Sequence, residues 1–210
     1  MSSSARYHHG DLRAACLRAA MELLEQDGAT ALSLRAVARR AGVSPGAPYR
    51  HYADRNALIS AVAAVGYREL GAHLAAAHPW PSTPDDLAAV AIAYVHFALA
   101  RPALFRVMFS EPCDRDSSER VAATAAISEY VGAIVRQSFP GADVEAMSTA
   151  VWALVHGLAF LHLDGKLDAS TPEVVSSRVR AAVDAVLTAS ELTSRAKPAG
   201  SSGIRFLATS

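Results

Sequence analysis

The sequence has little of several features that mark particular classes of protein. Its 210 residues carry no net charge, because 20 Lys and Arg balance 20 Asp and Glu, and 51% of them are apolar. This composition excludes a disordered polyelectrolyte and argues against a protein that coats nucleic acid by bulk attraction, although it allows a local basic patch. The two cysteines, Cys16 and Cys113, stand far apart without a CxxC partner. Neither a disulfide framework nor a zinc knuckle is therefore predicted.

Signals for export or membrane insertion are also scarce. The N-terminal sequence MSSSARYHHGDL has no apolar segment of the secretory type. Residues 146–163 lack Lys, Arg, Asp and Glu, but they include His156 and His162 and are flanked by Glu145 and Asp164. Since basic rather than acidic residues anchor membrane spans, we interpret this stretch as a helix buried in a bundle. We expect a cytoplasmic protein with no membrane partner.

Patterns for metal binding or cofactor chemistry are missing as well. The sequence contains no glycine-rich phosphate loop and no HExxH, so we predict no catalytic residue, no cofactor and no metal. His156 and His162 are six residues apart and cannot share a helix face as a metal-binding pair does. His8 and His9 fit a basic arm before a DNA-binding helix and a disordered terminus equally well.

Apolar residues recur at helical spacing along nearly the whole chain, while Val, Ile and Thr do not cluster at strand spacing. The expected fold class is all-α. Prolines interrupt the pattern at residues 79, 81 and 84, and a Ser/Gly-rich stretch ends the chain. We expect a three-helix N-terminal domain at residues 1–55, a helical C-terminal domain at 56–195 and a flexible tail at 196–210.

Capping residues predict several helix boundaries. A first helix is expected to end near Asp27, and Ser33 is expected to cap a second helix that Gly42 ends in a left-handed conformation. Ser44 and the proline after it are expected to start a third helix, and Asp54 a fourth over residues 55–77. Further helices are expected near residues 84–100, 102–110, 116–138, 143–164 and 172–193.

The segment from Ser33 to Tyr52 carries the clearest functional signal. Two short helices joined through a glycine turn have the geometry of a helix-turn-helix. Residues 33–55 hold five arginines and one acid within a chain that is neutral overall. Polar side chains near a helix N-terminus can bind phosphate oxygens, which the helix dipole also attracts. A helical hairpin with a solvated arginine face fits the composition equally well.

The same segment resembles the DNA-binding domain of TetR-type transcriptional regulators, whose signature runs roughly T-x-x-x-[IV]-A-x-x-A-G-V-S-x-G-x-x-Y-x-[HY]-F-x-x-[KR]-x-x-L. The matching residues are Val37, Ala38, Ala41, Gly42, Val43, Ser44, Gly46, Tyr49, His51, Arg55 and Leu58. Ser33 stands for the threonine and Tyr52 for the phenylalanine. The resemblance covers about residues 8–75. Residues 151–165 also resemble the "WHG" type of TetR C-terminal domain.

This resemblance implies a set of DNA contacts. Residues 44–51 would form the recognition helix, and Tyr49, His51 and Arg55 would bind phosphates. Arg35 is the candidate for a base contact, because arginine pairs bidentately with guanine. The implied set is Ser33, Arg35, Ser44, Pro45, Gly46, Ala47, Tyr49, Arg50, His51 and Arg55.

Pro48 departs from the family pattern, since leucine, isoleucine or threonine often stands at its position. A proline there can remove a helix hydrogen bond and shift the recognition helix. With Gly46 and Ala47 beside it, this helix offers few long side chains for direct readout. Thymine methyl groups and DNA shape are therefore expected to contribute to specificity.

The resemblance also implies a C-terminal domain that binds a small, mostly apolar effector and dimerises. The effector pocket is expected near Phe97, Phe105, Met108, Phe109, Trp152, His156 and Phe160, although without the resemblance such an aromatic group is more often plain core than a ligand cavity. Dimerisation is expected through residues 143–164 and 172–193 of both subunits, with Val179 and Val183 at the interface. The expected function is a homodimeric repressor that its effector releases from a palindromic, double-stranded DNA operator. The alternative is a small helical ligand-binding protein or enzyme with an incidental helix-turn-helix.

Overall fold

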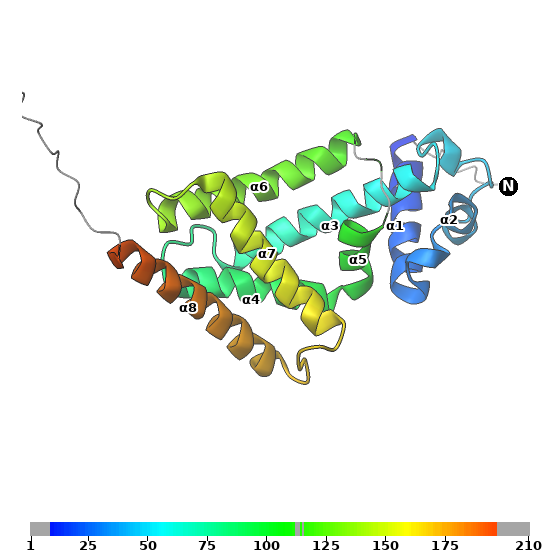
Figure 1. The fold of residues 1–210 in the computed structure, drawn as a ribbon. Coiled ribbons are helices and arrows are strands. Elements are labelled where there is room, and N and C mark those ends of the chain that lie inside the picture. The colour runs from blue at the N-terminus through cyan, green and yellow to red at the C-terminus, as the bar shows by residue number, and fades with distance from the viewer. Residues whose placement is uncertain (1–8, 112–113, 115, 197–210) are drawn as a thin grey trace, which may run out of the picture.

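The computed structural model describes residues 9–111, 114 and 116–196, and within them every regular element is a helix (Figure 1). The helices are α1 (His9–Asp27), η1 (Ala29–Ala31), α2 (Leu34–Ala41), η2 (Pro48–Arg50), α3 (Arg55–Ala77), α4 (Pro84–Ala100), α5 (Pro102–Ser110), α6 (Ser118–Ser138), α7 (Val144–Leu163) and α8 (Pro172–Ala196), where η marks a 3₁₀ helix. The all-α fold class is confirmed. The predictions for His8, Cys113 and residues 197–210 lie outside the described residues.

Short polar side chains begin the helices where the sequence places them. The Ser33 hydroxyl accepts a hydrogen bond from the Ala36 amide at 3.2 Å, and the Asp54 carboxylate accepts one from the Ala57 amide at 2.8 Å. Gly42 ends α2 with φ 68°, the left-handed conformation that glycine adopts most easily. Thr83 begins α4 with a reciprocal capping box. These local hydrogen bonds account for the predicted starts of α2, α3 and α4.

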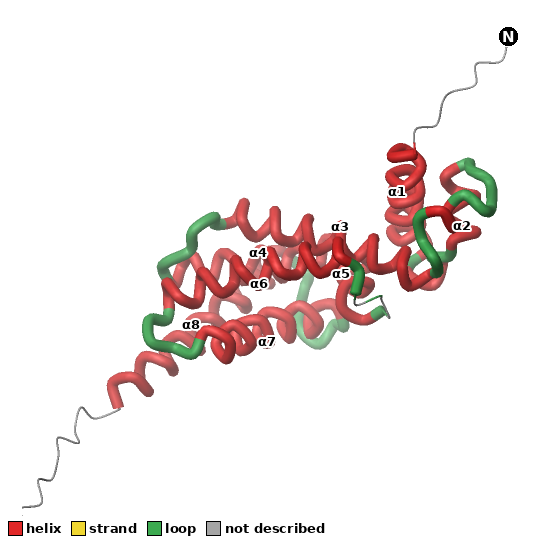
Figure 2. The backbone as a smooth tube through the Cα atoms, turned by 90° about the horizontal axis from the view of Figure 1, so that it is seen from above, coloured by secondary structure: helices red, strands yellow, loops and turns green. Residues whose placement is uncertain are grey.

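Helix α3 connects the two parts of the molecule. Its N-terminal end packs on α1, and its remaining length packs on α4, α5 and α6. Figure 2 shows α1 and α2 at one end of the molecule and the C-terminal end of α8 at the other. One apolar core runs from Leu12 on α1 through Leu58 and Leu70 on α3 to Val183 on α8. A continuous core of this kind lets α3 act as a rigid connection between the ends.

Helices α7 and α8 differ in how much of their apolar surface their own chain buries. Val175, Val179 and Val183 of α8 are buried, and α8 packs mainly on α4. The prediction that Val179 and Val183 lie between subunits is therefore wrong, because this face of α8 is already covered by α4 of the same chain. Helix α7 has 20 residues, of which Val155, Leu158, Ala159 and His162 are buried, so much of its apolar surface stays uncovered by its own chain.

Helix α7 is long and apolar enough to cross a membrane, whereas α4 and α5 reach that size only together, across a bend of 102°. A core helix of a soluble protein meets the same criteria. In this fold α7 packs on α4 and α6 and contacts α8. Residues 146–163 therefore belong to the helical bundle, but the expectation that they are buried is wrong for this subunit, since only a small part of the helix is covered by its own chain.

Gly66 on α3 allows a close approach to α5. A Cβ atom built on Gly66 would lie 2.5 Å from Sδ and 2.8 Å from Cγ of Met108. We expect Gly66→Ala to destabilise the protein by about 1–3 kcal/mol, because overpacking outweighs the better helix propensity of alanine. Denaturant unfolding measures this change.

Gly71, on the same helix, provides the matched control. A Cβ atom there would meet Ile127 at 3.7 Å, an ordinary contact. Gly71→Ala should therefore stabilise the protein by about 0.5–1 kcal/mol. Equal stabilisation by both substitutions would contradict the close packing of α3 on α5.

Candidate functional site

The segment after α2 is a turn that continues into a 3₁₀ helix. The Ala47 amide donates to the Ser44 carbonyl at 2.9 Å, and the Arg50 amide donates to the Ala47 carbonyl at 3.2 Å. Pro48 has no N–H, so it cannot donate the α-helical hydrogen bond to Ser44. The helix predicted over residues 44–51 is therefore shorter than expected: it is reduced to the 3₁₀ helix η2 (Pro48–Arg50), after which the Tyr52 amide donates to the Pro48 carbonyl at 3.0 Å.

One side of the turn packs on the protein core, and the other side is exposed to solvent. Ala47 and Pro48 are buried, and so is Tyr52, whose ring lies beneath the Arg13 guanidinium at 5.9 Å. The DNA contact implied for Ala47 is wrong, because its methyl group packs into the core. Ser44, Pro45, Gly46, Tyr49 and Arg50 remain exposed. The structure thus presents these five residues as one surface.

Three arginines of this region are exposed and have no hydrogen bond or ion pair within the described part of the chain: Arg35, Arg39 and Arg50. Arg39 was missed by the sequence analysis, although its spacing of four residues from Arg35 places both on one face of α2. Arg40 is engaged instead, since it donates to Gln26 at 2.8 Å and pairs with Glu22 at 3.5 Å. Of the five arginines in residues 33–55, only these three are therefore both exposed and without a partner among the described residues.

Arg55 holds the structure together. Its guanidinium donates to the carbonyls of Leu32 and Ala29, each at 3.0 Å, and pairs with Glu111 at 3.3 Å. It joins the segment before α2 to α3 and to the end of α5. Its Nε and Nη2 are thus engaged within the chain, and the phosphate contact implied for Arg55 stays a prediction.

Two other predicted contact residues have mixed surroundings. Ser33 is exposed, and its hydroxyl oxygen caps α2. His51 is half-buried, and its Nε2 is buried without a hydrogen-bond partner among the described residues. Neither observation tests whether these side chains contact phosphate, and both contacts stay predictions.

The motif GVSPG at residues 42–46 fits the GxSxG pattern of a hydrolase nucleophile elbow. That elbow requires a strand before the serine and a helix after it. Here α2 precedes Ser44 and a turn follows it. The pattern therefore belongs to the helix-turn-helix region. No group of three or more His, Cys, Asp or Glu side chains able to hold a metal ion occurs among the described residues.

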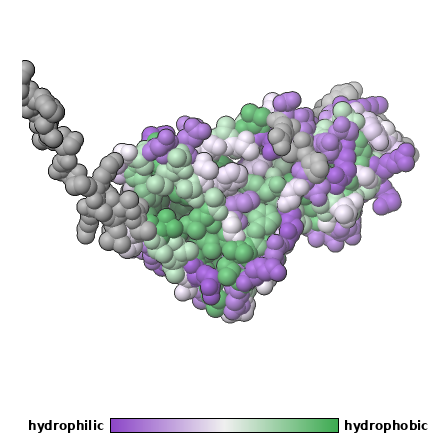
Figure 3. Space-filling view, viewed as in Figure 1, coloured by the Kyte–Doolittle hydropathy of each residue, from purple (hydrophilic) through white to green (hydrophobic). Residues whose placement is uncertain are grey.

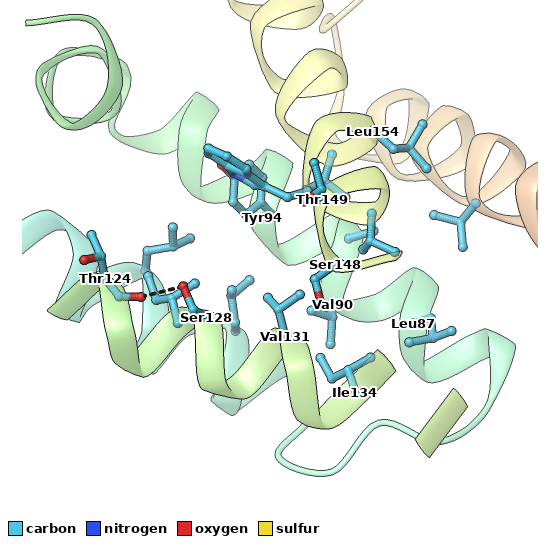
Figure 4. A pocket seen from close by; sticks show the side chains of 18 of the residues that line it. Leu87, Val90, Tyr94, Thr124, Ser128, Val131, Ile134, Ser148, Thr149 and Leu154 are labelled. Carbon is cyan, nitrogen blue, oxygen red and sulfur yellow. Dashed lines mark hydrogen bonds between the residues drawn. The ribbon is translucent and has the colours of Figure 1, made fainter. Parts of the chain in front are cut away.

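A cavity of about 670 Å³ lies among α3, α4, α5, α6, α7 and α8 (Figure 4). Its wall is mostly apolar, with contributions such as Leu70 from α3, Val90 from α4, Val131 from α6 and Val155 from α7. Apolar residues gather over α7 in the space-filling view, where the surface is hollowed (Figure 3). The cavity's size and lining are typical of a small-molecule site.

The expected pocket residues fall into two groups. Met108, Phe109 and Trp152 line the cavity. The residues that do not line it are Phe97, Phe105, His156 and Phe160. This correction has a simple physical reason: Phe105, His156 and Phe160 contact one another, and Phe97 packs on His73, so these rings fill space as core beside the cavity.

His156 lies at the centre of this aromatic group. Its ring centroid lies 4.6 Å from that of Phe109 and 4.8 Å from that of Phe160, and its Nδ1 lies 3.0 Å from the Tyr94 hydroxyl. Burial lowers the pKa of His156 and raises that of Tyr94, so both side chains are neutral at pH 7. The Nδ1 atom of His156 is thus engaged within the chain, by Tyr94.

Ion pairs connect the helix-turn-helix region with the helices that surround the cavity. Arg13 on α1 pairs with Glu119 on α6 at 2.6 Å, and Arg101 pairs with Glu25 on α1 at 2.8 Å and with Glu69 on α3 at 2.9 Å. Because Arg101 lies between α4 and α5, its pairs tie the cavity wall to α1. The two candidate sites are thus parts of one connected structure.

Two family models match this chain. One, described as bacterial regulatory proteins of the tetR family, matches residues 17–62, which include α2 and the exposed turn. The other, described as the tetracyclin repressor-like C-terminal domain, matches residues 87–186, which include most of the cavity wall. The chain belongs to the TetR family. It is therefore a DNA-binding transcriptional regulator with an N-terminal helix-turn-helix, as the sequence resemblance implied.

Solved structures share the fold of this TetR-family chain. A protein of unknown function from Rhodococcus sp. RHA1 is 35% identical, with a TM-score of 0.71 over 87% of this chain and 98% of that one. A bacterial regulatory protein in the tetR family from Rhodococcus RHA1 is 24% identical, with a TM-score of 0.61, 82% of this chain and 95% of that one being covered. PfmR, a TetR family transcriptional regulator from Thermus thermophilus, is 19% identical, with a TM-score of 0.58 and coverages of 82% and 97%. No curated protein matches the chain.

The contacts of Arg55 predict that it stabilises the fold. Arg55→Ala leaves two carbonyls and Glu111 without their cation, so we expect a loss of about 1.5–3 kcal/mol in the free energy of unfolding. Arg50→Ala, on the exposed turn, should change the free energy of unfolding by less than about 0.5 kcal/mol. Thermal or denaturant unfolding measures both variants, and an Arg55→Ala protein as stable as Arg50→Ala would contradict the structural role.

Proposed function

We propose that this TetR-family regulator is a cytoplasmic, homodimeric repressor, without catalytic activity, that a small and mostly apolar molecule releases from a palindromic operator. The observation that carries the proposal is the cavity of about 670 Å³ within the same continuous core as the helix-turn-helix. A ligand there contacts α3, whose N-terminal end begins directly after the exposed turn. Ligand binding and operator binding can therefore be coupled through one rigid helix.

The proposed DNA surface combines α2 with the turn after it. Arg35 and Arg39 point from one face of α2, and Tyr49 and Arg50 extend from the turn. Arg35 is proposed to pair with a guanine edge. Tyr49, whose side chain is 53% exposed, is proposed to donate a hydrogen bond from its hydroxyl to a phosphate oxygen. The small residues between them allow close contact with the DNA backbone.

The proposed dimer surface consists of the faces of α7 and α8 that their own chain leaves uncovered. Ala146, Ala150, Ala153, Gly157 and Leu161 are exposed along α7 at intervals of three or four residues. Ser177, Ala181 and Ala185 are exposed in the same way along α8. Small side chains permit close helix contacts, and four such helices would form a bundle between two subunits. Two-fold symmetry then presents two helix-turn-helix regions to a palindromic site.

Exposed arginines provide the test of DNA binding. With an operator selected from random DNA, Arg35→Ala should cost about 1–3 kcal/mol of binding free energy, mainly at one base position of each half-site. Arg50→Ala should weaken binding to all sequences and reduce the salt dependence by about one unit per subunit. Fluorescence anisotropy across a salt series measures both effects.

Arg136→Ala is the control for DNA binding, because Arg136 is exposed on α6 in the C-terminal part. It should leave operator affinity unchanged. Full operator affinity in an Arg35→Ala/Arg50→Ala double variant would refute the proposed DNA surface.

Gly157 tests the dimer surface. A Cβ atom at Gly157 meets nothing within 4 Å in its own chain, so Gly157→Arg is compatible with the folded subunit. We expect this variant to be monomeric, because a long cation blocks the close approach of a partner helix. Gln137→Arg, on the exposed side of α6, should stay dimeric. Sedimentation equilibrium distinguishes monomer from dimer. An unmodified protein that is monomeric at micromolar concentration would refute the proposed dimer.

A further inference from the structure

Most polar groups on the cavity wall already have partners. The hydroxyls of Thr124, Ser128 and Thr149 donate to carbonyls one helical turn before them. The Tyr67 hydroxyl donates to the Met108 carbonyl at 2.8 Å, and Tyr94 is paired with His156. Figure 4 shows the bond between Ser128 and Thr124. These side chains therefore have few free donors for a ligand.

Arg120 and Ser148 are the exceptions on this wall. The Nε of Arg120 and the Oγ of Ser148 are both buried and have no hydrogen-bond partner among the described residues. A buried donor without a partner costs free energy, the more so when it is charged. Glu119, the residue next to Arg120, is paired with Arg13 at 2.6 Å and does not neutralise it. The mostly apolar wall thus contains a guanidinium whose buried Nε has no partner among the described residues.

The location of Arg120 favours an anion. It lies in the first turn of α6, whose N-cap Ser117 makes no side-chain capping bond, so the helix dipole adds positive potential there. Glu145 lies at the start of α7, which follows the C-terminal end of α6 closely in the chain. It therefore lies toward the opposite end of the cavity and repels an anion from that end.

We propose that the cavity binds an apolar molecule that carries a carboxylate, and that Arg120 pairs with this carboxylate. The inference rests on the proposed ligand-responsive function and gives the chemical class of its ligand. Leu70, Val131 and Val155 contact the apolar body of the ligand. A ligand of this kind satisfies the buried donor that the described residues of the chain leave without a partner.

The same turn of α6 also contacts the DNA-binding part. Glu119 pairs with Arg13 of α1, and the Arg13 guanidinium lies over the ring of Tyr52 directly after the exposed turn. A ligand that draws Arg120 toward the cavity moves Glu119 with it, because the two residues are neighbours in one helical turn. The Arg13–Glu119 pair therefore transmits part of the ligand's effect to the helix-turn-helix.

Three chemically matched probes test the head-group class: dodecanoate, dodecanol and dodecylamine, each below its micelle-forming concentration. Trp152 lines the cavity and reports binding by its fluorescence, in a Trp80→Phe background that removes the other, exposed tryptophan. We expect dodecanoate to bind about 10- to 100-fold more tightly than dodecanol, as for a hydrogen bond to a charged group. Arg120→Gln should abolish this preference, and Arg136→Gln on the exposed side of α6 should keep it.

Two results would overturn the assignment. Equal affinity for dodecanoate and dodecanol would show that Arg120 does not select an anion, and tighter binding of dodecylamine would place the head group at Glu145. Both measurements use the protein without DNA. Their outcome is therefore independent of operator binding. A failure to bind any operator would refute the proposed function, not the proposed ligand class.

Glu119→Gln tests the connection to α1. This variant should bind dodecanoate within about two-fold of the unmodified protein, because Glu119 does not line the cavity. The loss of operator affinity caused by dodecanoate should be up to about five-fold smaller, since a half-exposed ion pair carries limited energy. An unchanged effect of dodecanoate on operator affinity in Glu119→Gln would exclude the pair from the coupling.

Discussion

At Gly66, α3 lies so close to α5 that a Cβ atom would be 2.5 Å from the sulfur of Met108. This contact fixes the position of α3, the one helix shared by both halves of the molecule. Next to it, the Tyr67 hydroxyl donates to the Met108 carbonyl at 2.8 Å. At the N-terminal end of α3, Arg55 pairs with Glu111 after the end of α5. The helix is thus held against α5 along its length. Because it also lines the cavity, α3 is the rigid element through which the proposed ligand would act on the exposed turn.

Local signals were enough to predict most helix boundaries. The predicted span of α3, residues 55–77, agrees with the structure because Asp54 caps its start and the proline-rich segment prevents its continuation. The exposed turn shows where such reasoning failed. A family pattern implied a recognition helix, whereas Pro48 lacks the N–H that an α-helix needs and leaves only a 3₁₀ turn. The departure was visible in the sequence, but its consequence depended on Ala47 and Pro48 being buried together.

The cavity could not be located from sequence in the same way. Aromatic residues such as Phe105 and His156 suggested a ligand site by their bulk, yet rings of this size fill space by packing on one another. The actual wall includes a stripe of moderate-sized residues on α6, among them Ile127 and Val131. A cavity is the volume that packed helices leave unfilled. Its position depends on distances between helices, which the spacing of residues within each helix does not determine.

The arginines of the helix-turn-helix region fall into two groups, those with internal hydrogen-bond partners and those exposed to solvent. Only the three-dimensional structure shows which arginine belongs to which group. Arg40 and Arg55 are held by internal contacts, so three exposed arginines per subunit remain for DNA: Arg35, Arg39 and Arg50. In the proposed dimer, six cationic contacts would give a salt dependence of operator affinity of about −5 on a double-logarithmic scale. This is a moderate electrostatic contribution, in a chain without net charge. A coupling free energy of about 1–3 kcal/mol from the cavity is then a substantial part of what holds the protein on its operator. In the function that we propose, the internal contacts of Arg40 and Arg55 limit the number of cations that face DNA, which keeps operator binding weak enough for a small molecule to reverse.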